Sequence, residues 1–153
     1  MMINSILDRE LTLCKAQGSS KKRVLENIAE FIHQHYPHID ADELFRQLTA
    51  RERLGSTGIG HGIAIPHCRS NQVQTAIACL VTLKEPIDFD AHDDAPVDII
   101  FVLIAPENAS DEHLNILAGL AGLMNQADFR NNLRKSTSSD ELYNAAARFD
   151  LAA

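Results

Sequence analysis

Residues 51–67 read RERLGSTGIGHGIAIPH and form the most informative segment of the chain. Eight consecutive residues of this segment, 55–62, contain four of the chain's seven glycines: Gly55, Gly58, Gly60 and Gly62. Glycine adopts positive φ without steric cost, so backbone amides in such a bend can turn toward one point and hold an anion. The apolar run 63–65 predicts a short strand, and Pro66 places His67 at its end, where α/β folds commonly bind ligands.

His67 is the reactive group that this segment predicts. Histidine has an ordinary pKa near 6.5, so it is largely neutral in a cell, and a ring nitrogen can attack phosphorus without a separate strong base. The same spacing also fits a tight crossover followed by an ordinary loop histidine. A nucleotide site is disfavoured, because neither GxxxxGK[ST] nor GxGxxG occurs and the glycines precede a strand instead of a helix.

Upstream of this segment, the sequence predicts one strand and two helices. Residues 11–14 alternate in polarity, which indicates a short strand. Apolar residues recur at helical spacing over residues 21–36, and Pro37 then stops the helix. Asp40 with Glu43 three residues later resembles a capping box, so a second helix should run from there to the glycine-rich segment.

Downstream, two apolar runs rich in branched residues predict central strands at residues 75–83 and 97–105, because strands buried on both faces have this composition. Helices should follow: one capped by Ser110 or Asp111, a short one around residues 129–133, and one capped by Ser138. The predicted order is therefore a strand, two helices, three strands, and two or three helices. A three-layer α/β/α sandwich accommodates this order best.

Length and charge limit the class of protein. The 153 residues are close to the usual size of one domain, so we expect residues 1–153 to form a single domain. The formal net charge of −7 disfavours binding to nucleic acid or to anionic membranes. The longest wholly apolar run, residues 99–105, is far shorter than the roughly 20 residues of a membrane span. Three cysteines without a CxxC pair suit a reducing compartment, so we expect a cytoplasmic protein.

Two further groups of histidines need an interpretation. His33, His35 and His38 are close in sequence, but the first two point to different faces of a helix and Pro37 interrupts the geometry, so no metal or cofactor is expected. His113 falls in the first turn of a predicted helix and could face the end of the sheet, where it could meet His67. An unimportant histidine at a helix start fits that position equally well.

The motif at residues 51–67 resembles the signature of enzyme IIA domains of the bacterial phosphoenolpyruvate-dependent phosphotransferase system, in the mannitol/fructose/nitrogen class. Residues 112–117, EHLNIL, resemble the second histidine motif of that class. GIGHGIAIPH at residues 58–67 is most similar to the nitrogen-regulatory branch, whose members are free-standing proteins. The resemblance covers nearly the whole chain and implies a mixed central sheet of four to five strands between helical layers.

The resemblance also implies a function and a site. His67 would accept a phosphoryl group from a histidine-containing phosphocarrier protein, and His113 would support the phosphorylated state. Arg51, Ser56 and Thr57 would bind the phosphate. The chain would then be a cytoplasmic phosphocarrier that forms a phosphohistidine, not a self-contained metabolic enzyme, and its phosphorylation state would control binding to regulatory or transport proteins.

Two alternatives remain open within this class. The chain could be a sugar-specific enzyme IIA that passes phosphate to a permease IIB domain. It could also be a regulatory binding module that is no longer phosphorylated, because Cys68 stands where the family more often has glycine and could strain the site or expose an oxidisable thiol. Around His67, an apolar docking patch could include Ile59, Ile63 and Ile65.

Overall fold

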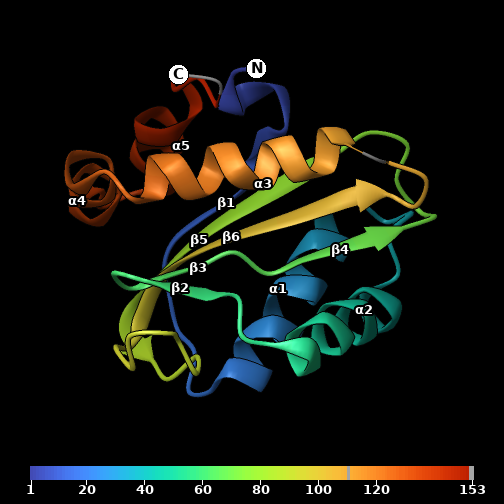
Figure 1. Ribbon diagram of the computed structural model, residues 1–153, viewed down its shortest axis with the longest axis horizontal. Helices are drawn as coiled ribbons and strands as arrows, with labels where there is room; N and C mark the ends of the chain where they lie inside the picture. The colour runs from blue at the N-terminus through green and yellow to red at the C-terminus, as the bar shows by residue number, and fades with distance from the viewer. Residues whose placement is uncertain (110, 152–153) are drawn as a thin grey trace.

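The computed structural model describes residues 1–109 and 111–151, and it places a six-stranded mixed sheet between two layers of helices (Figure 1). In chain order the elements are η1 (Ile3–Ser5), β1 (Leu7–Ala16), α1 (Lys21–His35), α2 (Ala41–Leu54), β2 (Gly58–Gly60), β3 (Ile63–Ala64), β4 (His67–Ser70), β5 (Ile77–Ile87), β6 (Val97–Pro106), α3 (Asp111–Met124), α4 (Ala127–Lys135) and α5 (Ser139–Ala147). The predicted α/β/α sandwich is confirmed. None of the helices in the described part of the chain is long and apolar enough to cross a bilayer.

The sheet has the strand order β1-β5-β6-β3-β2, and β4 pairs with β6 beyond β3. β1 runs parallel to β5, β5 antiparallel to β6, and both β3 and β4 parallel to β6, so the sheet is mixed as expected. There are six strands instead of four to five, because β3 and β4 pair one after the other along the same edge of β6. Pro66, which has no N–H to donate, separates these two strands.

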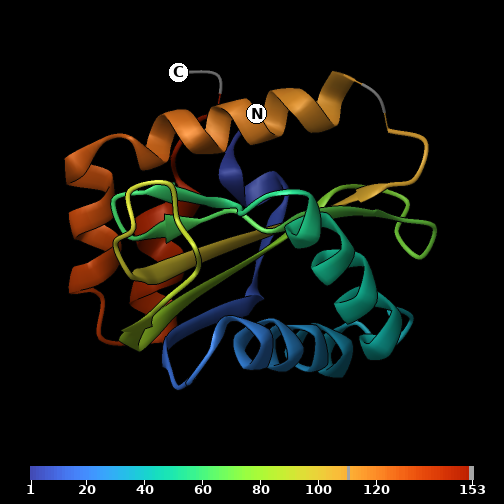
Figure 2. The same cartoon turned by 60° about the horizontal axis from the view of Figure 1, so that its bottom comes forward.

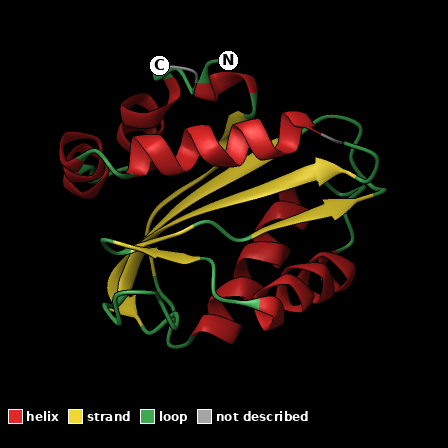
Figure 3. Ribbon diagram, in the orientation of Figure 1, coloured by secondary structure: helices red, strands yellow, loops and turns green. Residues whose placement is uncertain are grey.

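The two helical layers cover opposite faces of the sheet (Figures 2 and 3). Helices α1 and α2 pack on one face and α3, α4 and α5 on the other, each over its own cluster of buried side chains. Successive residues of β6 alternate between the clusters: Ile100 and Val102 face the first, whereas Ile99, Phe101 and Leu103 face the second. Burial on both faces explains why this strand has a continuous apolar sequence.

Helix caps define where three of the helices begin. The Asp40 side chain accepts a hydrogen bond from the Glu43 backbone N–H at 2.9 Å, and Ser138 caps α5 in the same way. The second half of the capping box differs from the prediction, because the Asp40 N–H donates to Gln72 instead of Glu43. Ser20 caps α1. Helix α3 begins at Asp111, and the expected cap Ser110 lies outside the described residues.

Candidate functional site

His67 is the first residue of β4, and it lies in a cleft between α2 and the start of α3. Figure 1 shows β4 running between these two helices. The cleft has a volume of about 490 Å³ and is lined by residues of all three elements: Gln47, Ala50, Arg51, Leu54, His67, Cys68, Arg69, His113, Leu114 and Leu117. The backbone of His67 pairs with Leu103 in β6, and its side chain is half-buried. The sheet therefore holds the histidine firmly while one side of its ring faces the cleft.

Two hydrogen bonds define which nitrogen of His67 is reactive. Nδ1 lies 2.9 Å from the carbonyl oxygen of Ile65, which can only accept, so Nδ1 carries the proton. Nε2 lies 3.2 Å from Arg51 Nε, which can only donate, so Nε2 presents its lone pair. The neutral ring therefore has its nucleophilic nitrogen on the side of Arg51.

Burial lowers the pKa of His67 below its ordinary value of 6.5. The positive charge of Arg51 lowers this pKa further, whereas the hydrogen bond to Ile65 and the charge of Glu52 oppose the shift. The imidazole is thus neutral near pH 7, which is the state in which Nε2 can act as a nucleophile.

His113 lies beside His67, with 5.7 Å between the two ring centroids. Its side chain belongs to the first turn of α3 and is only 5% exposed. Burial is the main reason that the pKa of His113 is lowered, and the nearby charges of His67 and Arg69 add to it. Its Nδ1 has no hydrogen-bond partner among the described residues. A buried nitrogen without a partner costs about 1–3 kcal/mol, so a group entering the cleft would gain by bonding to it.

Arg51 comes from the last turn of α2 and spans the cleft toward His67. Besides the bond to His67 Nε2, its Nη1 donates to the carbonyl of Gly55 at 2.9 Å. A guanidinium has five N–H groups, so three remain for an anion. The structure thus brings together three of the sequence-predicted residues: Arg51, His67 and His113.

Ser56 and Thr57 lie elsewhere. Ser56 Oγ donates to the carbonyl of Phe89 at 2.7 Å, and the Thr57 hydroxyl donates to the Glu52 carboxylate, which also pairs with Lys21 at 2.7 Å. Neither hydroxyl lines the cleft. These bonds tie the segment after α2 to α1 and to the chain after β5. Phosphate binding by Ser56 and Thr57 therefore stays a prediction.

The glycine-rich bend also differs from the expected anion cradle. Gly60 and Gly62 have φ of +101° and +79°, but they form the turn between β2 and β3, away from the cleft lining. The His61 N–H inside this turn donates to Asp93, and the His61 carbonyl accepts from Arg134, which also pairs with Asp98. The glycines are required to reverse the chain, so that β3 and β4 can run along β6.

Two residues of the cleft escaped the sequence reasoning. Gln47 lies one helical turn before Arg51, and its buried Oε1 has no hydrogen-bond partner in the part of the chain that the structure describes. Arg69 follows His67 by two residues in β4, so both side chains lie on the same side of the strand. Their spacing from Arg51 and His67, four residues in a helix and two in a strand, is the signal that could have identified them.

Cys68 does not disturb the site. It does not have positive φ, it pairs with Ile104 in β6, and it is 8% exposed. Burial raises the pKa of its thiol to about 12, which keeps it protonated and unreactive. The expected strain and exposed thiol are therefore not found.

The apolar surface beside His67 also differs from the expectation. Ile63 and Ile65 are buried in the core, and only Ile59 of the three expected residues is exposed. Leu54 and Leu114 are 85% and 59% exposed instead, on opposite sides of the cleft.

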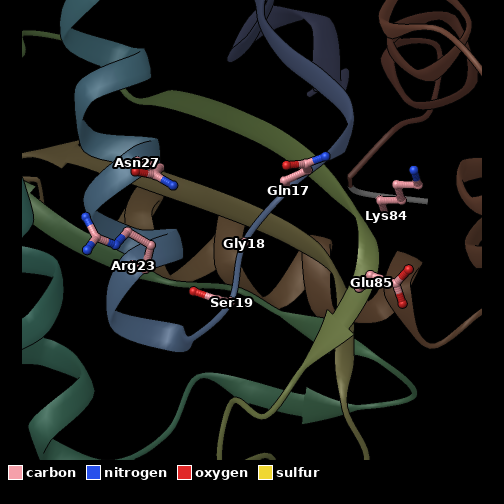
Figure 4. A pocket seen from close by; sticks show the side chains of 7 residues that line it. All are labelled: Gln17, Gly18, Ser19, Arg23, Asn27, Lys84 and Glu85. Carbon is pink, nitrogen blue, oxygen red and sulfur yellow. The ribbon is translucent and has the colours of Figure 1, made fainter.

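A second hollow lies at the turn between β1 and α1 (Figure 4). It is lined by Gln17, Gly18, Ser19, Arg23, Asn27, Lys84 and Glu85. It contains no histidine or cysteine, and its Arg23 pairs with Glu26 at 2.9 Å. The cleft at His67 is therefore the stronger candidate for group transfer.

Comparison with known proteins agrees with this fold. Residues 5–148 match the family model described as "Phosphoenolpyruvate-dependent sugar phosphotransferase system, EIIA 2". The chain belongs to this enzyme IIA family. Within it, a nitrogen regulatory protein of Pseudomonas aeruginosa is 47% identical over 141 residues, covering 92% of each chain. The nitrogen regulatory protein of Escherichia coli is 37% identical over 144 residues, covering 94% of this chain and 88% of the relative.

Solved structures place the fold in the same family. The crystal structure of nitrogen regulatory protein IIA-Ntr from Neisseria meningitidis has a TM-score of 0.87 and 38% identity, and the match covers 94% of this chain and 98% of the other. The mannitol IIA of Escherichia coli has a TM-score of 0.73 at 18% identity, over 90% and 96% of the two chains, which shows a shared fold. The chain is thus a phosphotransferase-system IIA protein of the kind that includes nitrogen regulatory proteins.

Proposed function

We propose that this protein is a cytoplasmic phosphotransfer regulator that receives a phosphoryl group on His67 Nε2 from a histidine-containing phosphocarrier protein. The observation that carries the proposal is the pair of hydrogen bonds on His67, which leaves Nε2 unprotonated beside Arg51. Residues 1–153 would act as one domain, with phosphorylation state deciding which regulatory or transport protein is bound.

In the proposed step, the Nε2 lone pair attacks the phosphorus atom on the carrier. A new N–P bond forms at His67, the N–P bond to the carrier's imidazole breaks, and the electron pair stays on the carrier's nitrogen. His67 gains no proton and loses none, because its Nδ1–H remains bonded to Ile65. Arg51 has to turn its Nε–H from Nε2 to the incoming phosphoryl oxygens.

Stabilisation of the product is the second requirement. A phosphoryl group brings about −1.5 to −2 charges if it behaves as on other side chains. Arg51 has three free N–H groups for it, and the unpaired Nδ1 of His113 can donate when it is protonated. Proposed support therefore comes from Arg51 and His113, with Arg69 adding a positive charge at the mouth of the cleft.

A nitrogen-regulatory role is favoured over a sugar-specific one by the relatives. The nitrogen regulatory proteins reach 47% and 37% identity, whereas a fructose-specific EIIA component of Haloferax volcanii is 28% identical over 145 residues. Cys68 was the reason to consider a binding module that is no longer phosphorylated. The structure does not support that reason, because Cys68 neither strains the backbone nor exposes its thiol.

The direct test is phosphorylation with phosphoenolpyruvate, enzyme I, the phosphocarrier and this protein. We expect acid-labile label on the wild type and none on His67→Ala, because the attacking nitrogen is removed. His92→Ala is the matched control, since His92 is an exposed histidine outside the cleft. Full labelling of His67→Ala would refute the assignment.

A further inference from the structure

Two buried side-chain atoms in the described part of the chain lack a hydrogen-bond partner, Gln47 Oε1 and His113 Nδ1. Both residues line the cleft at His67, from α2 on one side and from α3 on the other. Buried polar atoms are nearly always paired, so each exception needs a reason. The proposed function supplies one for His113, whose ring nitrogen can donate to a phosphoryl group, but it supplies none for Gln47.

The amide oxygen of Gln47 needs a donor, and a phosphoryl group is not one. At neutral pH a phosphoryl group offers mainly acceptor oxygens, and the amide oxygen also only accepts. Two residues of the cleft lining have side-chain N–H groups without a partner among the described residues, Arg51 and Arg69. Arg51 is the better candidate, because it lies four residues after Gln47 in α2, and side chains at this spacing are neighbours on a helix.

Arg51 has to move when His67 is phosphorylated. Its Nε lies 3.2 Å from His67 Nε2, and no atom fits between two nitrogens at that distance, so the guanidinium occupies the place of the incoming phosphorus atom. The guanidinium is also held forward along the chain, because Nη1 donates to the carbonyl of Gly55. Helical side chains more often lean toward the helix N-terminus, and for Arg51 that direction leads back over Gln47.

From these observations we propose that Gln47 is a positioning residue, which receives Arg51 when the phosphoryl group arrives and holds the guanidinium beside the phosphoryl oxygens. The inference rests on the proposed function. Arg51 exchanges His67 Nε2 and the Gly55 carbonyl for the phosphoryl oxygens and the Gln47 carbonyl, so it gives up two acceptors and gains at least two. Gln47 takes part in no covalent step and neither gives nor takes a proton.

The neutral amide of Gln47 suits this exchange. A carboxylate at the same position would pair with Arg51 before phosphorylation and would repel the incoming negative charge. An amide oxygen binds a guanidinium more weakly, so Arg51 can return to His67 when the phosphoryl group leaves. Arg51 thus has two carbonyl partners on α2 and its C-terminal end: Gly55 without the phosphoryl group, and Gln47 with it.

The test is a double-mutant cycle that combines Gln47→Met with Arg51→Ala. Methionine has nearly the length of glutamine but no amide oxygen. Single-turnover transfer from phosphorylated carrier is measured by rapid quench at saturating carrier, so that weaker docking does not change the rate. We expect Gln47→Met alone to slow transfer about tenfold, and to slow it no further when residue 51 is alanine, because Gln47 acts only through Arg51.

Thermal melting separates positioning from a structural role. Gln47→Met removes a buried acceptor that is unpaired in the unphosphorylated protein, so we expect a melting temperature equal to or above that of the wild type, although transfer is slower. Gln34→Met is the matched control, because Gln34 is exposed in α1 and lies outside the cleft lining. Its transfer rate should equal that of the wild type.

Three results would overturn the inference. The first is an equal slowing by Gln47→Met with arginine and with alanine at position 51, because Gln47 would then act without Arg51. The others are an unchanged rate in Gln47→Met, and a fall in melting temperature that accompanies the slower transfer. All three presuppose a labelled wild type. A wild type that accepts no phosphoryl group on His67 would instead refute the proposed function, and this inference with it.

Discussion

At the scale of single residues, the site depends on how one imidazole is held. The Ile65 carbonyl occupies Nδ1, and the Arg51 guanidinium lies against Nε2, so tautomer and direction are both defined before any partner arrives. His113 contributes a second, almost fully buried ring at 5.7 Å. Cys68, between His67 and Arg69, is unreactive because it packs into the core cluster under α1 and α2 and burial raises the pKa of its thiol.

Arg51 is the residue whose removal tests this arrangement most directly. We expect Arg51→Ala to slow phosphoryl transfer to His67 by about a hundredfold or more, because one positioned donor for developing charge accounts for roughly 10²–10³ in rate. Arg51→Lys should be intermediate, since lysine keeps the charge but loses the planar fork. The measurement is single-turnover transfer from phosphorylated carrier, with Arg23→Ala as a control on a distant surface pair. Unchanged rates in Arg51→Ala would remove Arg51 from the site.

At the scale of elements, the β2–β3 hairpin connects α2 to the strand that carries His67. Gly62 has φ of +79°, and a Cβ there would lie 2.4 Å from Arg134 Nη2 and 2.8 Å from Asp98 Oδ1. Arg134 and Asp98 hold the turn through their ion pair and through the His61 carbonyl. The glycines expected to cradle an anion therefore serve to fold the chain back onto β6.

Gly62→Ala is expected to destabilise the protein by about 1–3 kcal/mol, the usual cost of forcing an L side chain into such a conformation. The free energy of unfolding in urea is the measurement. Gly122→Ala is the contrasting control, because its Cβ would meet nothing within 4 Å in α3, and alanine is favoured over glycine in a helix by roughly 0.5–1 kcal/mol. Equal stability of the two variants would show that a side chain at position 62 is not strained.

At the scale of the whole molecule, the half-buried His67 and the buried His113 link the site to stability in acid. Burial lowers the pKa of both His67 and His113 below 6.5, so the unfolded chain binds more protons than the folded one between those lowered values and 6.5. The free energy of unfolding therefore falls as the pH falls below about 6.5, and it is unaffected by these groups at higher pH.

We expect His113→Gln to make this acid dependence shallower, because one of the two shifted groups no longer titrates. Urea unfolding from pH 7.5 down to the acid limit of folding, at about half-unit steps, measures the slope. His92→Gln is the control, since that histidine is exposed in the folded state as it is in the unfolded chain. A slope in His113→Gln as steep as that of the wild type would show that His113 is not protonated on unfolding in this range.

The local features of the chain could be predicted from the sequence because they depend on neighbours a few residues apart. Helical periodicity, the caps at Asp40 and Ser138, and the apolar runs of β5 and β6 determined the layers and the order of elements. The motif at residues 51–67 singled out His67, which the structure places in the lining of the cleft. Short strands such as β2 and β4 were missed, because their pairing comes from β6 and not from their own composition.

Only the tertiary structure decided which side chains meet. Arg51, His67 and His113 come from the end of a helix, the start of a strand and the start of another helix, and they converge because β4 lies along β6 between α2 and α3. The same packing places the Ser56 and Thr57 hydroxyls against Phe89 and Glu52, and it leaves Leu54 and Leu114 exposed in the lining of the cleft. Hydrogen bonds of a few ångströms depend on how whole elements pack, and residue spacing along the chain carries little of that information.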